Sequence, residues 1–435
     1  MNPPYPPVEL LEGAKPTKVP MEYMPHLSLR ERNRRWDQLR KRMMLARIDV
    51  LLFMGTDIFW DMGIANIRYI FHAGGKMSTY GLFFIDHDPV LWNSPPHENR
   101  PYNFFHSIQD WTTDIRTFMG MPGIAAELKD LGFTRRRIGL VGFSSNMVPP
   151  TMVESDVQAI KRYLPQAEFV EASWLLEQMR MVKSEEEIGM LRNAARIGRK
   201  VIDAVMETAK PGVTEATVFA EMIRTQIING AEPNVFNLFN SGPVEHPKTE
   251  LWHLLHGVEQ PQVPSMRPLA KGDIIVSEWH TKYCGYLAHT EFTFYLGAKP
   301  PQELVDIFKV CVECLDVSKE VLKAGTTLRE AWEAIRRPAA KAGLDWVELG
   351  FHSMGVASPE HPTVVYQEGY GGNAANGHRI GDFVLEEGMC FGNNLDLYNP
   401  RWKMDVGCQL ADFMVVRKNG AECLVNVPRE IGAIA

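Results

Sequence analysis

Four ionisable side chains lie close together in a stretch that otherwise has the pattern of buried strands. The stretch from residue 276, VSEWHTKYCGYLAHTEFTFYLG, carries Glu278, His280, His289 and Glu291. Residues two positions apart on a strand point to the same face, so Glu278 and His280 share a face, as do His289 and Glu291. Mixed nitrogen and oxygen ligands suit zinc or iron. Histidines beside carboxylates also suit metal-free proton transfer, so both kinds of site stay open.

Histidines outside this stretch enlarge the set. His352 stands in FHSMG, and VEHPKTELWHLLHGVEQP carries His246, His253 and His256. A histidine titrates near neutral pH, so it can take a proton from water or give one to a leaving nitrogen. We expect His352 and one of the three upstream histidines to be catalytic. The sequence alone leaves open which of those three points inward.

Arg379 follows a glycine-rich segment in the last third of the chain. It stands in NGHRIGD, where a guanidinium can bind a carboxylate through two parallel hydrogen bonds or form a structural salt bridge. The preceding GYGGNAANG lacks the strand and helix that flank a phosphate-binding loop. We interpret it as a loop near the mouth of a pocket.

The first half of the chain has the alternation of an α/β domain. Residues 27–46 have the periodicity of an amphipathic helix, and the apolar run IDVLLFMG, residues 48–55, suits a buried strand. Residues 66–75 and 80–92 also have strand character. We expect this domain to end near residues 170–181.

The second half opens with a strong helix signal. Ser184 is a good N-cap, and Glu187 three residues later completes a capping box. We expect this helix to stop at Pro211-Gly212. KPGVTEA, from residue 210, resembles KAGTTLREA, from residue 323, and both join two predicted helices. This internal similarity indicates a duplicated αβ unit.

Length and composition set broad limits. The 435 residues suggest two or three domains, and six cysteines are too few for a disulfide framework in so long a chain. The formal net charge of -7 gives no reason to expect a nucleic acid or an anionic membrane as partner. No apolar run is long enough for a transmembrane helix, and the N-terminus lacks the apolar core of a signal peptide. We therefore expect a cytoplasmic protein.

Six segments, in chain order, resemble landmarks of the creatinase, aminopeptidase P and methionine aminopeptidase superfamily, which has the pita-bread fold. They are MVKSEEEIGMLRNAARI, NSGP, LAKGDIIVSEWHTKYCGYLAHTEFT, FHSMG, LEEGMCFGNNLDLY and DVGCQLADFMVVRKNG. The resemblance implies an α/β (α+β) protein with two domains. Residues 1–180 would form an N-terminal creatinase/prolidase-like domain with an extended arm, and residues 181–435 the pita-bread catalytic domain.

The metal ligands of this superfamily are mostly replaced. Its peptidases hold two metal ions with two Asp, one His and two Glu, and those positions fall here on Glu278, His289, His352, Asn394 and Ala411. Two adjacent divalent cations need several anionic oxygens, but Asn394 is neutral and Ala411 offers no donor. The resemblance therefore predicts no peptidase-type dinuclear centre.

Creatinase has this fold, lacks the metal ligands, and hydrolyses a C–N bond with a histidine and glutamates. GYLAHTEFT is similar to its GYYTALERT, which puts Glu291 at a substrate-binding glutamate, and HSMGV is similar to its HSFGV. HGVEQP resembles the HxxP string before the GD turn, which favours His256. The resemblance implies a metal-independent hydrolase of a C–N bond in a small organic molecule, with His256, His352 and Glu291 as catalytic residues.

The same resemblance suggests which residues hold the substrate. We expect Glu278, His289, Asn394, Arg379 and Trp279 to bind it, with Trp279 as part of an apolar lining. Asn394 replaces the glutamate with which creatinase holds a guanidinium, so creatine itself is not the expected substrate.

Two alternatives stay open. A dimethylsulfoniopropionate lyase branch has a rearranged metal site with an acidic residue where this chain has His280. No cofactor is favoured, but a single divalent metal on Glu278, His280, His289 and His352 would suit a lyase that cleaves a C–S or C–C bond. The third hypothesis is a non-catalytic binding protein of the same fold, against which the ionisable pocket argues.

The resemblance also implies a homodimer. In such a dimer the partner's N-terminal domain closes the pocket over a small-molecule substrate. NIRYIFHAGGKMSTYG, with Arg68, His72 and Lys76, is the segment that we expect to make this contribution.

Overall fold

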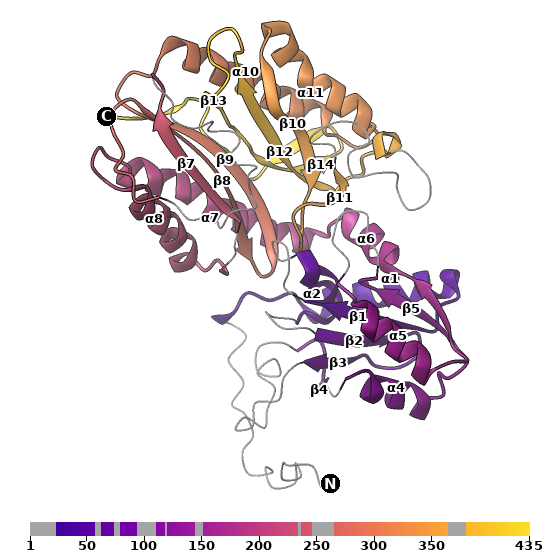
Figure 1. The fold of residues 1–435 in the computed structure, drawn as a ribbon. Helices are drawn as coiled ribbons and strands as arrows, with labels where there is room; N and C mark the ends of the chain where they lie inside the picture. The colour runs from indigo at the N-terminus through magenta and orange to yellow at the C-terminus, as the bar shows by residue number, and fades with distance from the viewer. Residues whose placement is uncertain are drawn as a thin grey trace. The chain divides into compact units, whose positions relative to one another are not determined.

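The computed structural model describes residues 23–56, 62–73, 79–93, 110–117, 120–143, 151–233, 236–245, 265–363 and 380–435. The chain forms two compact units, Met1–Met179 and Arg180–Ala435, and the ribbon shows the elements of each (Figure 1). Helix α6, Ser173–Met181, runs across the division between them. Within the described ranges, no helix is long and apolar enough to cross a membrane.

A six-stranded mixed sheet forms the first unit. Its order is β4-β3-β2-β1-β5-β6, and β1 pairs antiparallel with β2 and parallel with β5. The strands are β1 Val50–Gly55, β2 Thr79–Phe84, β3 Val90–Asn93, β4 Asp114–Thr117, β5 Arg137–Val141 and β6 Glu168–Glu171. The helices before α6 are α1 Leu29–Ala46, α2 Ala65–Phe71, α4 Met121–Asp130 and α5 Glu154–Tyr163, with a short 3-10 turn, η3 Met62–Ile64.

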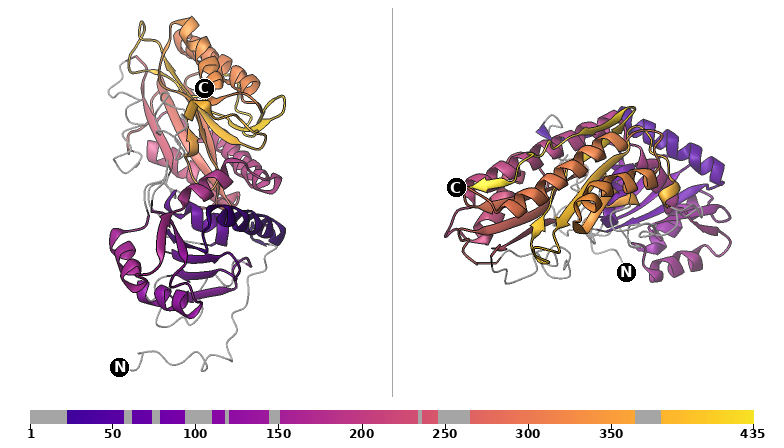
Figure 2. Two further views of the ribbon diagram at one scale, coloured as in Figure 1. Left: turned by 90° about the vertical axis from the view of Figure 1, so that its right-hand side faces the viewer. Right: turned by 90° about the horizontal axis from the view of Figure 1, so that it is seen from above.

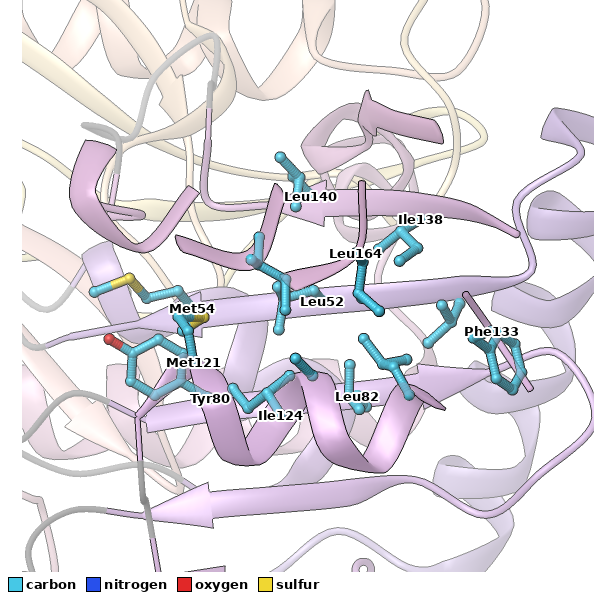
Figure 3. Close-up of a cluster of buried hydrophobic side chains, with 14 of the residues drawn as sticks. Leu52, Met54, Tyr80, Leu82, Met121, Ile124, Phe133, Ile138, Leu140 and Leu164 are labelled. Carbon is cyan, nitrogen blue, oxygen red and sulfur yellow. The ribbon is translucent and has the colours of Figure 1, made fainter. Parts of the chain in front are cut away.

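The core of this unit packs strands against α4 and α5. Figure 3 shows Leu52 of β1 and Leu82 of β2 facing Ile124 of α4, and all three are at most 1% exposed. The predicted buried strand IDVLLFMG is confirmed, since every residue of β1 is buried.

The predicted strand at residues 66–75 is wrong, because Ala65–Phe71 is the helix α2. Ile67, Tyr69, Ile70 and Phe71 are all buried. A short apolar run does not distinguish a buried strand from a buried helix, and this segment forms a helix. It ends at His72, which has a left-handed backbone (φ 49°).

The second unit contains two sheets. One has the order β16-β9-β8-β7, and the other has the order β11-β10-β12-β14-β15, with β13 paired to β12. The first sheet comprises β7 Asn237–Pro243, β8 Asp273–Tyr283, β9 Tyr286–Leu296 and β16 Gly432–Ile434. The second comprises β10 Asp345–Ser353, β11 Glu360–Thr363, β12 Cys390–Tyr398, β13 Gly407–Cys408, β14 Phe413–Arg417 and β15 Gly420–Cys423.

Helix pairs accompany each sheet. Helices α7 Glu185–Thr208 and α8 Glu215–Ile228 precede the first sheet in the chain, and α10 Gln302–Val321 and α11 Leu328–Ala342 precede the second. Figure 2 shows α10 and α11 in orange, lying side by side. The predicted capping box is confirmed: Ser184 Oγ accepts from Glu187 N at 3.2 Å, and Glu187 Oε2 accepts from Ser184 N at 2.9 Å.

The predicted duplication is confirmed at the level of individual hydrogen bonds. Gly212 N donates to Leu269 O (2.8 Å), and Gly325 N donates to Leu385 O (2.9 Å) at the equivalent turn. The two glycines have φ of 90° and 93°, where a side chain is disfavoured. Each turn is followed by a threonine N-cap, at residues 214 and 327. The second unit is therefore built from two αβ repeats.

Candidate active site

The β8–β9 hairpin brings the four ionisable residues of the opening stretch onto one face. Its register pairs Glu278 with Glu291 and His280 with His289, and directly paired residues of antiparallel strands point to the same side. Glu278 Oε1 lies 3.4 Å from both His280 Nε2 and His289 Nε2. His289 Nε2 lies 3.2 Å from Glu291 Oε1. The two predicted pairs thus form a single cluster.

The second repeat adds His352 to this cluster. His289 Nδ1 and His352 Nε2 are 2.9 Å apart and share a hydrogen bond. His352 lies on β10 opposite Gly392 of β12. A Cβ on Gly392 would lie 2.8 Å from His289 Nδ1, so only glycine leaves room for the imidazole. This glycine was missed by sequence reasoning.

Asn394 and Ala411 both contact Glu291, in different ways. Asn394 Nδ2 donates to Glu291 Oε1 at 2.7 Å. Ala411 N donates to the backbone oxygen of Glu291 at 3.1 Å and thereby joins the segment before β14 to β9. Asn394 was predicted to bind substrate, and in the structure its amide group positions Glu291.

Three further polar residues lie in the same interior and were missed by sequence reasoning. They are Glu348, Asp396 and Gln409, with exposed fractions of 3%, 0% and 0%. Gln409 Nε2 donates to Asp396 Oδ2 at 3.3 Å. Asp396 stands two residues after Asn394 on β12, so strand alternation was the one signal in the sequence that places both on one face.

Burial sets the ionisation of the histidines. Burial lowers the pKa of His280 well below its ordinary value, and the neighbouring His289 adds to this. Burial and the other two imidazoles likewise hold the pKa of His352 well down. For His289, burial lowers the pKa while Glu278 and Glu348 act in the opposite direction. At neutral pH the three imidazoles are therefore neutral and available as bases.

Burial has the opposite effect on the acids. It raises the pKa of Glu291 well above the ordinary value, and Glu278 and Glu348 raise it further. Burial also raises the pKa of Asp396 well above its ordinary value, as do Glu291 and Glu348. Strongly perturbed groups of both kinds in one interior are typical of a functional site.

Trp279 does not belong to this cluster. It follows Glu278 on β8, so its side chain points to the other face of the strand, where Nε1 donates to Gly198 O of α7 at 3.3 Å. Its predicted place in the substrate lining is corrected: the indole fills the interface between the helix and the sheet.

Several predicted site residues lie outside the described residues. They are His246, His253, His256, Arg379 and Lys76. Within the described residues, Glu278, His280, His289, Glu291, His352 and Asn394 come together.

The residues do not fit a peptidase-type dinuclear metal centre. Asn394 directs its amide nitrogen, a donor, at Glu291, and Ala411 contributes only a backbone N–H. Neither can supply the bridging carboxylate that two adjacent cations need. A single ion is a different case, because Glu278, His280 and His289 each offer a ligand atom within 4.8 Å of the others.

Residues 189–418, more than half of the chain, match metallopeptidase family M24. The chain belongs to metallopeptidase family M24. Residues 35–182 of this M24 protein match the creatinase/prolidase N-terminal domain. The predicted superfamily and the predicted combination of a creatinase-like N-terminal domain with a pita-bread domain are thereby confirmed.

Relatives of this M24 protein have different described activities. The probable dipeptidase PepE of Mycobacterium tuberculosis is 28% identical over 302 residues, which cover 67% of this chain and 72% of PepE. Ectoine hydrolase of Halomonas elongata is 25% identical over 279 residues, 63% of this chain and 65% of that enzyme. The crystal structure of X-Pro aminopeptidase from Thermotoga maritima has a TM-score of 0.72 at 18% identity and covers 92% of this chain and 99% of its own. The last similarity shows the fold.

Proposed function

We propose that this M24 protein hydrolyses a C–N bond in a small organic molecule without a metal ion, by acid–base catalysis at paired histidines. The observation that carries the proposal is the 2.9 Å hydrogen bond between His289 and His352, with carboxylates on the far side of His289. The ectoine hydrolase relative supports a small-molecule substrate.

We infer the tautomers of the two histidines from the acids beside His289. His289 Nε2 lies 3.4 Å from Glu278 Oε1 and 3.2 Å from Glu291 Oε1, and in the proposed scheme this nitrogen carries the proton. His289 Nδ1 is then the acceptor, and His352 Nε2 is the donor. His352 Nδ1 is left with a lone pair, which makes His352 the terminal base of a relay that begins at the carboxylates.

The exposed fractions of these side chains agree with their order in the proposed proton relay. His352 and Glu278 keep 6% and 5% of their surface exposed, whereas His289 and Glu291 have none. A substrate or water entering from solvent therefore meets His352 before it meets His289. We assign His352 as the catalytic base and His289 as the residue that orients it.

The reaction follows from these roles. His352 takes a proton from water while the water oxygen bonds to the carbon of the scissile bond. The imidazolium so formed is stabilised through His289 by Glu278. The proton then passes to the leaving nitrogen as the C–N bond breaks, which restores the neutral imidazole. His256, the other catalytic residue expected from the sequence, would be a second proton donor in this scheme.

Labelled water tests hydrolysis directly. The protein would be incubated in ¹⁸O-water with amidines, guanidines and amides. Xaa-Pro dipeptides would be included because its relatives include a probable dipeptidase and an Xaa-Pro dipeptidase. One ¹⁸O atom in the product is expected. Turnover without incorporation of label would overturn hydrolysis.

Metal content tests independence from metal. Mass spectrometry of the purified protein before and after dialysis against a chelator should give far less than one metal ion per chain, with unchanged turnover. One tightly held ion, whose removal abolishes turnover, would overturn the metal-free mechanism.

The second candidate is a lyase with a single metal ion, and one distance favours it. In tetrahedral zinc sites with bonds of about 2.1 Å, ligand atoms lie about 3.4 Å apart. Glu278 Oε1 stands at 3.4 Å from both His280 Nε2 and His289 Nε2. A bound ion that is lost in His280→Ala, together with product free of ¹⁸O, would move this candidate into first place.

We also propose that the protein acts as a homodimer in which the partner's N-terminal domain closes the pocket. Arg68 and His72, both on or next to α2, are the described residues of the predicted closing segment. Light scattering should give twice the chain mass. A monomer with full turnover would overturn the proposal.

A further inference from the structure

A glutamate and two cationic side chains lie buried next to the strand that carries His352, and the proposed reaction does not use them. Arg180 Nε lies 3.0 Å from Glu360 Oε1, and Lys183 Nζ lies 3.1 Å from Glu360 Oε2. The side chains of these three residues, the Glu360 cluster, are at most 3% exposed. A buried ion pair adds little net stability, because both partners lose their hydration, which favours a different role for this cluster.

Glu360 begins β11 at an irregularity in its pairing with β10. His352 of β10 pairs with Thr363 of β11. The next residue, Ser353, pairs with Glu360, so the register shifts directly after the histidine. Irregularities of this kind re-aim side chains and are frequent beside active sites. The place of Glu360 therefore helps to fix the direction of β10 at His352.

The carboxylate of Glu360 also holds the loop that follows His352. Glu360 Oε1 accepts from Ala357 N at 3.2 Å. Lys183 Nζ donates to Ser353 Oγ at 3.4 Å as well as to Glu360 Oε2, so the lysine bonds to both strands. Adjacent residues of a strand point to opposite faces, so Ser353 and His352 direct their side chains to opposite sides of β10. The Glu360 cluster therefore acts on His352 through the backbone of β10.

Gly355, in the same loop, connects the Glu360 cluster to the other histidine. A Cβ on Gly355 would lie 2.8 Å from Glu360 Oε2 and 2.9 Å from Lys183 Cε, so glycine leaves the space that the ion pair fills. Gly355 O accepts from Leu287 N at 2.8 Å. Leu287 lies on β9, two residues before His289. The loop thus continues the strand of one histidine and bonds to the strand of the other.

We propose that Glu360 is a positioning residue that sets the separation of His289 and His352. Held by Arg180 and Lys183, its carboxylate fixes the loop that follows β10. The role deepens the proposed function and rests on it for its catalytic meaning. The two imidazoles belong to different strands, and a displacement of about 1 Å at a catalytic group can cost about 100-fold in rate. Charge-assisted hydrogen bonds to one carboxylate restrict such a displacement.

A magnetic-resonance measurement on the histidines tests this role without any turnover. In protein labelled with ¹⁵N at the imidazoles, the hydrogen bond between His289 and His352 should give a scalar coupling between the two nitrogens that it joins. Glu360→Gln should abolish or markedly weaken this coupling, because the amide presents an NH₂ donor to one of the two cations. An unchanged coupling in Glu360→Gln, or no coupling in the wild type, would overturn the proposal.

Glu422→Gln is the matched control for the loss of one negative charge. Glu422 also accepts from two cationic side chains, those of Arg192 and Arg417, but it is 35% exposed. Glu422→Gln should therefore leave both the nitrogen–nitrogen coupling and the turnover unchanged. Equal loss of the coupling in the two variants would show a general effect of charge removal and would overturn the assignment to Glu360.

A triple variant separates positioning from stability. Arg180→Met, Lys183→Met and Glu360→Leu together replace the buried charges by apolar side chains, a change that often preserves or raises stability. The bonds to Ser353 and Ala357 are lost, however, so kcat should fall by up to about 100-fold with little change in KM, while the thermal midpoint stays at or above that of the wild type. Full turnover in a stable triple variant would overturn the positioning role. Absence of turnover in the wild type would count against the hydrolase proposal alone, because the coupling is measured without substrate.

Discussion

Gly392 lies directly against the imidazole of His289, with room for no further atom between them. A Cβ on Gly392 would be 2.7 Å from His289 Cβ and 2.8 Å from its Nδ1. Since Gly392 pairs with His352 across the second sheet, this contact joins the two repeats at the histidine pair.

Gly392→Ala should therefore destabilise the protein and separate the histidines. Overpacking of this kind costs about 1–3 kcal/mol, measured as the free energy of unfolding in urea. Gly189→Ala is the matched control: Gly189 lies in α7, and no atom lies within 4 Å of the place that a methyl group would occupy, so alanine should be neutral or stabilise by about 0.5–1 kcal/mol. Equal effects of the two changes would refute the steric argument.

His352→Asn should abolish most turnover while leaving the fold intact. Removal of the base that accepts the water proton costs about 10²–10⁴-fold in kcat. The measurement is kcat with whichever substrate the labelled-water screen identifies. His87→Asn, at a histidine with 40% exposure in the first unit, should keep full activity. An active His352→Asn protein would remove His352 from the mechanism.

Asn394→Asp should lower the free energy of unfolding far more than so small a change of side chain suggests. It replaces the donor to Glu291 Oε1 by a second acid at 2.7 Å in a buried site, which we expect to destabilise the fold by about 2–4 kcal/mol at neutral pH. The loss should shrink at low pH as the new carboxyl takes up a proton. Asn399→Asp, where Oδ1 accepts from Arg401 N, is the same substitution near the surface and should change stability by less than about 0.5 kcal/mol.

Asp412 should make stability fall as pH rises through the mildly acidic range. Burial raises its pKa to about 6, against about 3.9 in an unfolded chain. The folded state therefore binds the proton more tightly, and the free energy of unfolding drops by about 3 kcal/mol between about pH 4 and pH 6 from this group.

Asp412→Asn removes that titration and should flatten the pH dependence. It should also lower stability at pH 4, because the Asp412 oxygens accept from the backbone N–H groups of Phe413, Val425 and Val427, and an amide NH₂ cannot accept. Urea unfolding of both proteins across this range is the measurement. A variant with the same slope as wild type would show that Asp412 does not titrate as argued.

The fold could be predicted because its signals are local or lie in ordered motifs. The Ser184–Glu187 capping box and the repeated turn at residues 212 and 325 are short-range features, and both are present. The spacing of Glu278 and His289 likewise predicted a shared site, because a tight hairpin fixes their register.

The remaining site residues depend on long-range packing, which a single sequence does not encode locally. Gly392 must be glycine because of an imidazole more than a hundred positions away along the chain. Glu348 is brought to the site by an irregularity in the pairing of β10 with β12 between Trp346 and Leu349. Trp279 was predicted to line the pocket because it stands in a motif segment, but the motif does not show which face of the strand it occupies. Strand alternation from Glu278 would have placed it on the opposite face.

The two-repeat construction has a consequence for how this protein can fail. His289 belongs to the first repeat and His352 to the second. The hydrogen bond between them therefore exists only while the two repeats are packed against each other. A molecule that kept all its helices and strands but let the repeats slide apart by a few ångströms would look intact by circular dichroism and would be inert. Turnover in this protein therefore reports whether the two repeats are packed correctly against each other. Heat or mild denaturant should abolish turnover before secondary structure is lost.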